Sequence, residues 1–350
     1  MTDVAQASPA RVHSGAVPPD FMKQIASEFA PRAWIYWTDM LASAAVGWLL
    51  FFFSVQLPLF SAMQVLAGAG AVFALLRAAL FIHELCHLKS SQLPGFEVVW
   101  NLVVGIPLLI PSLMYVGSHM DPHKRMAFGT ESDPEYAPIA HWSRLRIAIF
   151  VVTVAFAPLL LPVRWGVLGP LSRLFPALRP WVVGKLSTLV INPGYTRPLP
   201  TGAHVRRWNL EEAATALFVW SVAALLTTGA LPLAWVFHWL ALGAGILVVN
   251  QVRTLAAHGY ENEGEPMEAE QQLLDSVNLS GPFLPDLLIA PVGLRFHALH
   301  HFLPSLPYHS LGAVHRRLLR VLPQDAAYRQ TESEGLQETL QTLWRRAAAH

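Results

Sequence analysis

The sequence predicts an all-α, multi-pass membrane protein with two transmembrane helical hairpins, interfacial helices and a cytoplasmic metal-binding cap. Only 13% of its 350 residues are charged, whereas soluble domains average about 25%. Its mean hydropathy is +0.40, and its uncharged stretches reach the length of about 20 residues that one membrane span requires. Its 15 histidines include groups beside these stretches, which predicts the metal-binding cap.

The first hairpin is predicted in residues 40–76, which contain no charged residue. Gln56 and Pro58 interrupt this stretch near its middle. Because one span takes about 20 residues, the stretch is long enough for two spans joined by a tight turn. Aromatic residues, which are typical of the membrane interface, precede it at Trp34, Tyr36 and Trp37.

The second hairpin is predicted in residues 213–252, which also lack charge and are interrupted at Gly229 and Pro232. Asn209 and Glu212 have the spacing of a capping pair, which predicts that the first helix of this hairpin begins there.

Two further apolar stretches, residues 98–116 and 147–163, are not expected to cross the membrane. Pro107 and Pro111 break helices in the first stretch. The second precedes residues 164–207, which contain seven Lys or Arg and no acidic residue. Such a segment is cytoplasmic under the positive-inside rule. We therefore expect four crossings, both termini inside, and two stretches that lie in the interface or dip in and return.

The remaining composition excludes several classes of protein. A net charge of +1 and the lack of a basic run argue against nucleic-acid binding. Cys86 is the only cysteine, so neither a disulfide framework nor a zinc site with several thiolates is possible. Residues 1–31 lack a signal-peptide pattern and are predicted to be a mobile tail. Residues 32–315 form the predicted membrane domain, and residues 316–350 a cytoplasmic C-terminal segment.

Three groups of histidines have spacings that suit metal binding. His83 and His87 are four residues apart and lie at the cytoplasmic end of the second predicted span. His119 and His123, further along the chain, have the same spacing. On a helix this spacing puts both imidazoles on one face, but chance gives it about 0.6 times here. Chance gives the third pattern only about 0.03 times. It consists of His297, His300 and His301.

All three groups fall at the same cytoplasmic boundary if the four-span scheme holds, and so does His258, just beyond the fourth span. Eight imidazoles are too many for one metal ion and suit two. All-imidazole ligation fits Fe, Cu, Ni or Zn, so the ligand type does not choose the metal. Each pair taken alone could equally consist of ordinary core or interfacial residues.

The segment HELCH also matches H-E-x-x-H, the zinc metalloprotease signature in which Glu84 would act as general base. An intramembrane protease needs a third zinc ligand, commonly an Asp from a distant helix. The second predicted hairpin offers no acidic residue for this role. This interpretation also leaves the group at residues 297–301 unexplained.

The segments HELCH, SHMDPHKRMAFGTESDPEY and FHALHHFLPSLPYHSL resemble the three histidine boxes of the membrane fatty acid desaturase superfamily. The resemblance covers about residues 35–315. It departs from the family in the second box, where Pro122 replaces a histidine, while His258 matches the family's extra histidine after the fourth span. It implies two iron ions and eight ligands: His83, His87, His119, His123, His258, His297, His300 and His301.

The resemblance implies an O2-dependent attack on an unactivated C–H bond at a di-iron centre. We predict a desaturase that introduces a double bond into a lipid acyl chain in a bacterial inner membrane. The boxes do not exclude a hydroxylase or ketolase acting on acyl chains, alkanes or carotenoids, and a non-enzymatic scaffold is a further alternative. No fused haem or flavin motif is visible, so electrons are expected from a separate carrier of the ferredoxin or cytochrome b5 type.

Metal-bound histidines generally need hydrogen-bond acceptors behind them. The sequence offers five candidates for such supporting positions, although a solvated turn explains Asp133 and Glu135 equally well. The five are Glu84, Asp133, Glu135, Tyr308 and His309.

Overall fold

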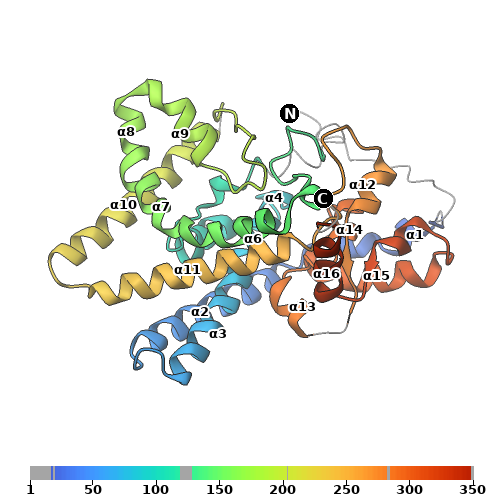
Figure 1. The fold of residues 1–350 in the computed structure, drawn as a ribbon, viewed down its shortest axis with the longest axis horizontal. Helices are drawn as coiled ribbons and strands as arrows, with labels where there is room; N and C mark the ends of the chain where they lie inside the picture. Colours follow the sequence, from blue (N-terminus) through green and yellow to red (C-terminus); the bar gives the residue numbers. More distant parts are fainter. Residues whose placement is uncertain (1–16, 19, 119–127, 203, 282–283, 348–350) are drawn as a thin grey trace. The chain divides into compact units, whose positions relative to one another are not determined.

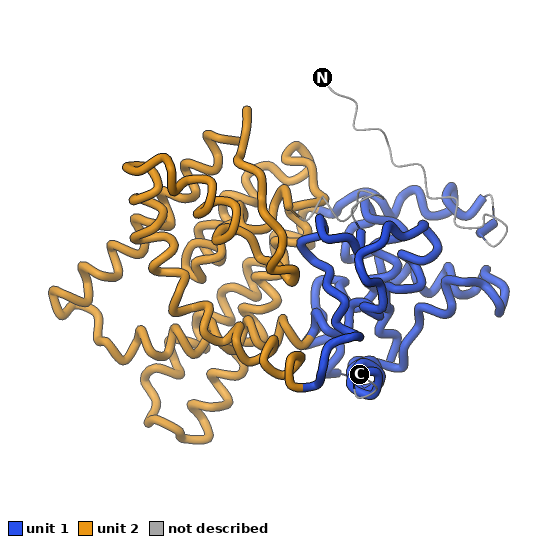
Figure 2. Tube along the Cα trace, turned by 45° about the horizontal axis from the view of Figure 1, so that its top comes forward, with its two compact units in different colours: residues 1–32, 121–144, 253–350 blue, residues 33–120, 145–252 orange. Residues whose placement is uncertain are grey.

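The computed structural model describes residues 17–347 except 19, 119–127, 203 and 282–283 (Figure 1). The described chain is mostly helical. It divides into two compact units, each made of segments distant in the sequence (Figure 2). Unit 1 comprises residues 1–32, 121–144 and 253–350, and unit 2 comprises residues 33–120 and 145–252.

Unit 2 contains the long apolar helices. Of these, α6 begins just before a boundary of the unit and α11 ends just after one. Its elements are α2 (Ala33–Val55), α3 (Ala62–Ala79), α4 (Phe81–His87), α5 (Phe96–Trp100), η2 (Asn101–Gly105), η3 (Ser112–Met114), α6 (Arg144–Thr153), η5 (Val154–Phe156), α7 (Ala157–Val163), η6 (Arg164–Leu168), α8 (Gly169–Leu174), η7 (Pro176–Leu178), α9 (Arg179–Leu186), α10 (His204–Thr227) and α11 (Leu233–Thr254).

The predicted first hairpin is confirmed as α2 and α3. Ser61 caps α3 by accepting a hydrogen bond from the Gln64 amide at 3.2 Å, which satisfies one exposed donor at the helix start. The two helices approach closely at Gly47, where a Cβ atom would lie 2.5 Å from Cγ of the buried Leu75. Small residues thus permit the contact that holds this hairpin together.

The second hairpin is confirmed as α10 and α11, but its predicted start is wrong. Helix α10 begins at His204, five residues before Asn209. Glu212 therefore lies inside the helix, where its carboxylate binds three guanidinium groups instead of capping a backbone amide. These belong to Arg164, Arg173 and Arg179.

In the described residues, five helices are long and apolar enough to cross a membrane: 33–55, 62–87, 144–174, 204–227 and 233–254. The prediction of four crossings is therefore not confirmed by helix length. Residues 147–163, expected to lie in the interface or to dip in and return, belong to a helical run of 31 residues, 144–174. The other ambiguous stretch, residues 98–116, lies partly in a helical run over residues 96–105 and contains a short 3-10 helix at Ser112–Met114. The longer run ends before Pro107, as the helix-breaking prolines predict.

Unit 1 is built from short elements. These are α1 (Phe21–Gln24), η1 (Ala26–Phe29), η4 (Ile139–His141), α12 (Ala269–Asp275), β1 (Asn278–Leu279), α13 (Leu284–Ile289), α14 (His297–Phe302), α15 (Tyr308–Val321), η8 (Ala327–Thr331), β2 (Glu332–Ser333) and α16 (Leu336–Arg346). Strands β1 and β2 pair in parallel. In the segment predicted as a mobile tail, Phe21 of α1 and Ile25, which directly follows this helix, are both buried.

Candidate metal centre

Three histidines converge inside unit 1. One nitrogen each of His258, His297 and His301 lies within 4.8 Å of the others. The Nε2 atom of His297 is 2.9 Å from Nε2 of His258 and 3.1 Å from Nε2 of His301. His297 and His301 share one face of α14 because they are four residues apart. His258 follows the end of α11 by four residues.

A short backbone ladder fixes the position of His258. The Val277 amide donates to the Ala257 carbonyl at 2.9 Å, and the Gly259 amide donates to the Asp275 carbonyl at 2.6 Å. These bonds form an antiparallel bridge between His258 and Ser276. The imidazole is thereby held beside the end of α12, although it lies in a loop.

Asn278, which is fully buried, fixes the start of α14. Its Oδ1 accepts a hydrogen bond from the Leu299 amide at 3.1 Å. Its Nδ2 donates to Thr331 Oγ1 at 2.9 Å and to Glu332 Oε1 at 3.0 Å. An N-terminal helix amide has no partner within its own helix, so Asn278 both satisfies this donor and ties α14 to the β2 segment.

A carboxylate and a phenol lie behind His258. Asp275 Oδ2 is 3.2 Å from His258 Nδ1, and the Tyr136 hydroxyl donates to Asp275 Oδ1 at 2.9 Å. Burial and the nearby Asp275 charge raise the pKa of Tyr136 well above its ordinary value, so its hydroxyl keeps its proton. The rings of Phe128 and Tyr260 pack against His258 at centroid distances of 5.4 and 5.3 Å.

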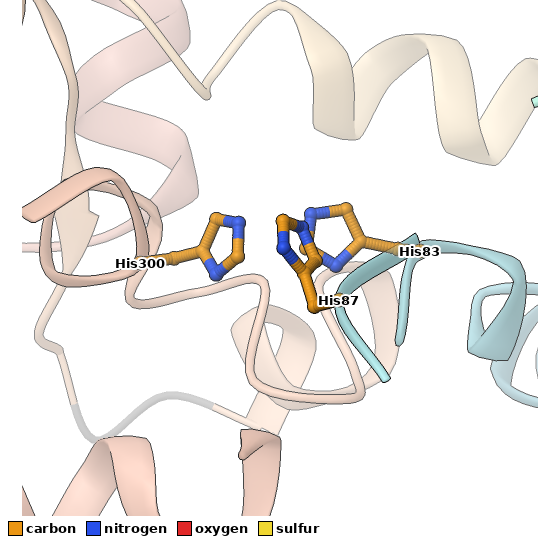
Figure 3. A group of neighbouring side chains, drawn as sticks. All are labelled: His83, His87 and His300. Atoms are coloured by element: carbon orange, nitrogen blue, oxygen red, sulfur yellow. The ribbon is translucent and has the colours of Figure 1, made fainter. Parts of the chain in front are cut away.

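Unit 2 carries the pair His83 and His87 on α4. Both imidazoles project from the same side of the helix (Figure 3), and their ring centroids are 5.0 Å apart. Glu84 lies between them in the sequence. Its side chain is buried and accepts a hydrogen bond from the Tyr36 hydroxyl at 2.5 Å. Its Oε1 atom is 3.7 Å from His83 Nδ1, which exceeds hydrogen-bond distance.

The other predicted ligands have different standings. His300, also drawn in Figure 3, is buried in unit 1 on α14, with its ring centroid 5.9 Å from that of His301. His119 and His123 lie outside the described residues, as does Pro122 between them. The second box therefore stays a prediction.

The predicted supporting residue Asp133 closes its own loop. Its carboxylate accepts hydrogen bonds from the Gly129 amide at 3.0 Å and the Glu135 amide at 2.8 Å. It is buried rather than solvated, and burial raises its pKa to about 6 despite these bonds.

His309 and Tyr308 lie at the start of α15. Nε2 of His309 accepts a hydrogen bond from the Arg32 amide at 3.1 Å, and its Nδ1 lies 3.1 Å from the Ser310 hydroxyl. Burial and the charge of Arg32 lower the pKa of His309. Tyr308 is buried, with its ring 5.7 Å from that of His309. His309 thus ties the N-terminal segment to α15.

Sequence reasoning missed Asp275 and its partner Tyr136. Asp275 lies in the segment LLDSVN, which has no metal-site spacing, and 139 residues separate it from Tyr136. Tyr136 ends the segment quoted for the second box, so an aromatic residue beside that box was the available signal.

The nitrogen positions in unit 1 fit a metal ion. His297 Nε2 faces two other Nε2 atoms. A ring nitrogen offers either one N–H or one lone pair, so it cannot form a good hydrogen bond with both neighbours at once. A cation bound by imidazole lone pairs resolves this conflict. The donor set suits iron and equally other transition metals.

Comparisons with known proteins found a matching family model and a similar protein. The model of the family described as fatty acid desaturase matches residues 61–332. A ceramide hydroxylase from Caulobacter vibrioides (strain NA1000 / CB15N) is 43% identical over 318 residues, which is 90% of this chain and 90% of that protein.

Proposed function

Because the chain belongs to the fatty acid desaturase family and is therefore an oxidoreductase, we propose that it hydroxylates a membrane lipid of the ceramide class. The observation that carries this proposal is the 43% identity to a ceramide hydroxylase across 90% of both chains. In the reaction, one oxygen atom of O2 enters a C–H bond of the lipid and the other leaves as water. A separate electron-transfer protein provides two electrons, and two protons are taken up.

We propose that the seven histidines of the three boxes and His258, eight in all, hold two iron ions. Three converging imidazoles in unit 1 support this assignment, as does the pair on α4 in unit 2. When bound, the irons would supply the reduction of O2 and the removal of a hydrogen atom from the lipid.

The protein side chains have two tasks in this reaction. The imidazoles of His258, His297 and His301 provide lone pairs at fixed positions, since α14 and the backbone bridge to Ser276 hold them. The rings of Phe128 and Tyr260 pack beside His258 and limit the access of water on that side. A dry, fixed site is the protein's usual contribution to chemistry carried by a cofactor.

Desaturation is the second candidate and was the first prediction from the sequence. Membership of the family supports it equally, because the boxes serve both outcomes. It differs in the fate of the lipid: a second hydrogen leaves, a double bond forms, and both oxygen atoms leave as water.

Lipid profiling of a host that expresses the protein tests the proposal and separates the two candidates. We expect new lipids heavier by one oxygen atom. We expect them to be absent with His300→Ala, because His300 is a proposed metal ligand in the histidine pattern that chance explains least. New double bonds without added oxygen would support the desaturase. Purified protein without iron, or unchanged products from His300→Ala, would contradict both.

The protease alternative predicts peptide cleavage that requires Glu84. In the structure Glu84 is buried and bound by Tyr36, and the family match covers the HELCH segment. We therefore expect that neither the wild type nor Glu84→Gln cleaves peptide substrates.

A further inference from the structure

Tyr136, Asp275 and His258 form a chain of hydrogen-bonding groups inside unit 1. Tyr136 accepts a hydrogen bond from the Asn262 amide at 3.1 Å and donates to Asp275 Oδ1 at 2.9 Å. Asp275 Oδ2 then faces His258 Nδ1 at 3.2 Å. The hydroxyl is thus fixed on both sides, and it in turn fixes the carboxylate.

This chain decides which nitrogen of His258 carries the proton. An ionised carboxylate only accepts hydrogen bonds, and a neutral imidazole has one N–H. The proton therefore lies on Nδ1, toward Asp275. The lone pair lies on Nε2, which faces His297 Nε2 at 2.9 Å. The Ser276 hydroxyl agrees with this assignment: it lies 3.4 Å from Nδ1 and donates its own proton to the Gln272 carbonyl at 2.9 Å, so toward Nδ1 it can only accept.

A cavity lies beside the same carboxylate. Its volume is about 510 Å³, and both His258 and Asp275 line it, together with Gln271, Glu338 and Arg346. Small molecules from solution can therefore reach the Asp275 position without passing through the histidine group.

We propose that Asp275 and Tyr136 are positioning residues for His258, acting together to hold its ring with Nε2 directed at a metal ion. The proposal rests on the proposed metal centre and deepens it. Carboxylates behind metal-bound histidines fix the ring and strengthen its binding, and their loss typically costs about 10- to 100-fold in metal affinity.

Cobalt(II) binding to the metal-free full-length protein in detergent tests the proposal, with visible absorption as a readout of ligand geometry. We expect Asp275→Asn to weaken Co²⁺ binding at one site by about 10- to 100-fold and to change the spectrum. Tyr136→Phe leaves the carboxylate in place but frees its orientation, so we expect a loss near the lower end, about 10-fold.

Chemical rescue gives a second readout that a general loss of structure would not produce. Asp275→Ala should bind Co²⁺ as weakly as Asp275→Asn, and formate should restore binding, since the cavity admits a free carboxylate to the vacated position. Formate should not restore binding in His258→Ala, because that variant lacks the ligand itself.

Unit 1 contains a matched control. His315 is held by the same kinds of group, with its Nδ1 2.8 Å from the Tyr328 hydroxyl and its Nε2 3.2 Å from Glu332. Tyr328→Phe removes an equivalent buried contact. We expect it to leave Co²⁺ affinity and the spectrum unchanged.

The outcomes separate this proposal from the proposed function. If His258→Ala loses a metal site while Asp275→Asn keeps wild-type affinity and spectrum, or if formate leaves Asp275→Ala unchanged, the positioning role is overturned and the metal centre stands. If the wild type binds no transition metal tightly, the proposed function itself fails.

Discussion

At the residue scale, the two nitrogens of each imidazole separate the structural histidines from the candidate ligands. His315 has a phenol at one nitrogen and a carboxylate at the other. His309 has a peptide amide at one and a hydroxyl at the other. His258 has a carboxylate at Nδ1, while within the described part of the chain its Nε2 faces another imidazole nitrogen. A ring whose two nitrogens both hold hydrogen-bond partners has no lone pair left for a metal ion. Residue spacing does not reveal these partners, so it cannot separate structural histidines from candidate ligands.

Glu332 gives a pH prediction at this scale. Burial opposes its ionisation, but hydrogen bonds from His315 and Ser280 outweigh burial and lower its pKa below the ordinary value of 4.5. A carboxyl group with a lowered pKa in the folded state stabilises the fold above its unfolded pKa, and this contribution is lost as the pH falls through the folded value.

We therefore expect the wild type to lose stability relative to Glu332→Gln as the pH falls below about 4.5. Unfolding midpoints in detergent between pH 7 and pH 3 measure this difference. A constant difference between the two proteins across that range would contradict the prediction. The exposed Glu265→Gln variant serves as the control, since it should follow the wild type.

At the element scale, helix contacts depend on small residues and on one buried carboxylate. Gly47 allows α2 to approach α3 at Leu75, and Gly245 allows α11 to approach Val72 of α3, where a Cβ atom would lie 2.8 Å from a valine methyl carbon. Glu212 joins α10 to η6, α8 and α9 through three arginines. The first kind of contact depends on shape and the second on charge.

Gly47→Ala tests the shape contact. The added methyl group would meet Leu75 Cγ at 2.5 Å and its backbone nitrogen at 3.1 Å. Overpacking of this kind costs about 1–3 kcal/mol, which exceeds the gain of about 1 kcal/mol in helix propensity. We expect net destabilisation in detergent unfolding. Gly68→Ala is the matched control, because nothing lies within 4 Å of its Cβ position. Equal stabilities of the two variants would refute the contact's importance.

Glu212→Gln tests the charge contact. The side chain of Arg164 is 4% exposed and donates to Glu212 Oε1 at 3.0 Å, so loss of the carboxylate leaves a buried cation without its counter-charge. Breaking a buried pair in this way costs about 3–5 kcal/mol. The free energy of unfolding measures it. A loss below that caused by Glu265→Gln at the surface would show that the cluster contributes nothing.

At the scale of the whole molecule, the number of crossings decides on which side the histidines lie. The α4 pair lies at the end of the second apolar helix, residues 62–87, and His258 follows the last. If residues 144–174 crossed the membrane, the two would lie on opposite sides. A shared metal centre therefore requires that this run does not cross, despite its length of 31 residues. We propose the four-span topology with the centre on the cytoplasmic side, in agreement with the seven basic residues at 164–207.

Single cysteines in a Cys86→Ala background test this topology with a membrane-impermeant maleimide. We expect Leu59→Cys and Thr228→Cys to be labelled from the same side and Thr201→Cys from the opposite, cytoplasmic side; all three native side chains are exposed. If residues 144–174 cross, Thr201→Cys will instead share the side of Leu59→Cys. That pattern would contradict a common face for the histidines.

The sequence by itself determined the features that depend on neighbours along the chain. Hydropathy and breaks at proline and glycine located both hairpins, and four-residue spacings located the pairs on α4 and α14, because a helix brings such residues to one face. It misplaced the start of α10, where Glu212 binds arginines that the local pattern could not reveal.

Only the tertiary structure decided the contacts between distant segments. His258 and His297 are 39 residues apart, and Tyr136 and Asp275 are 139 apart. No periodicity relates such positions, since loops and a backbone bridge bring them together. The sequence therefore determined which residue types could bind a metal, and the fold of unit 1 decided which nitrogens converge and which carboxylate lies behind them.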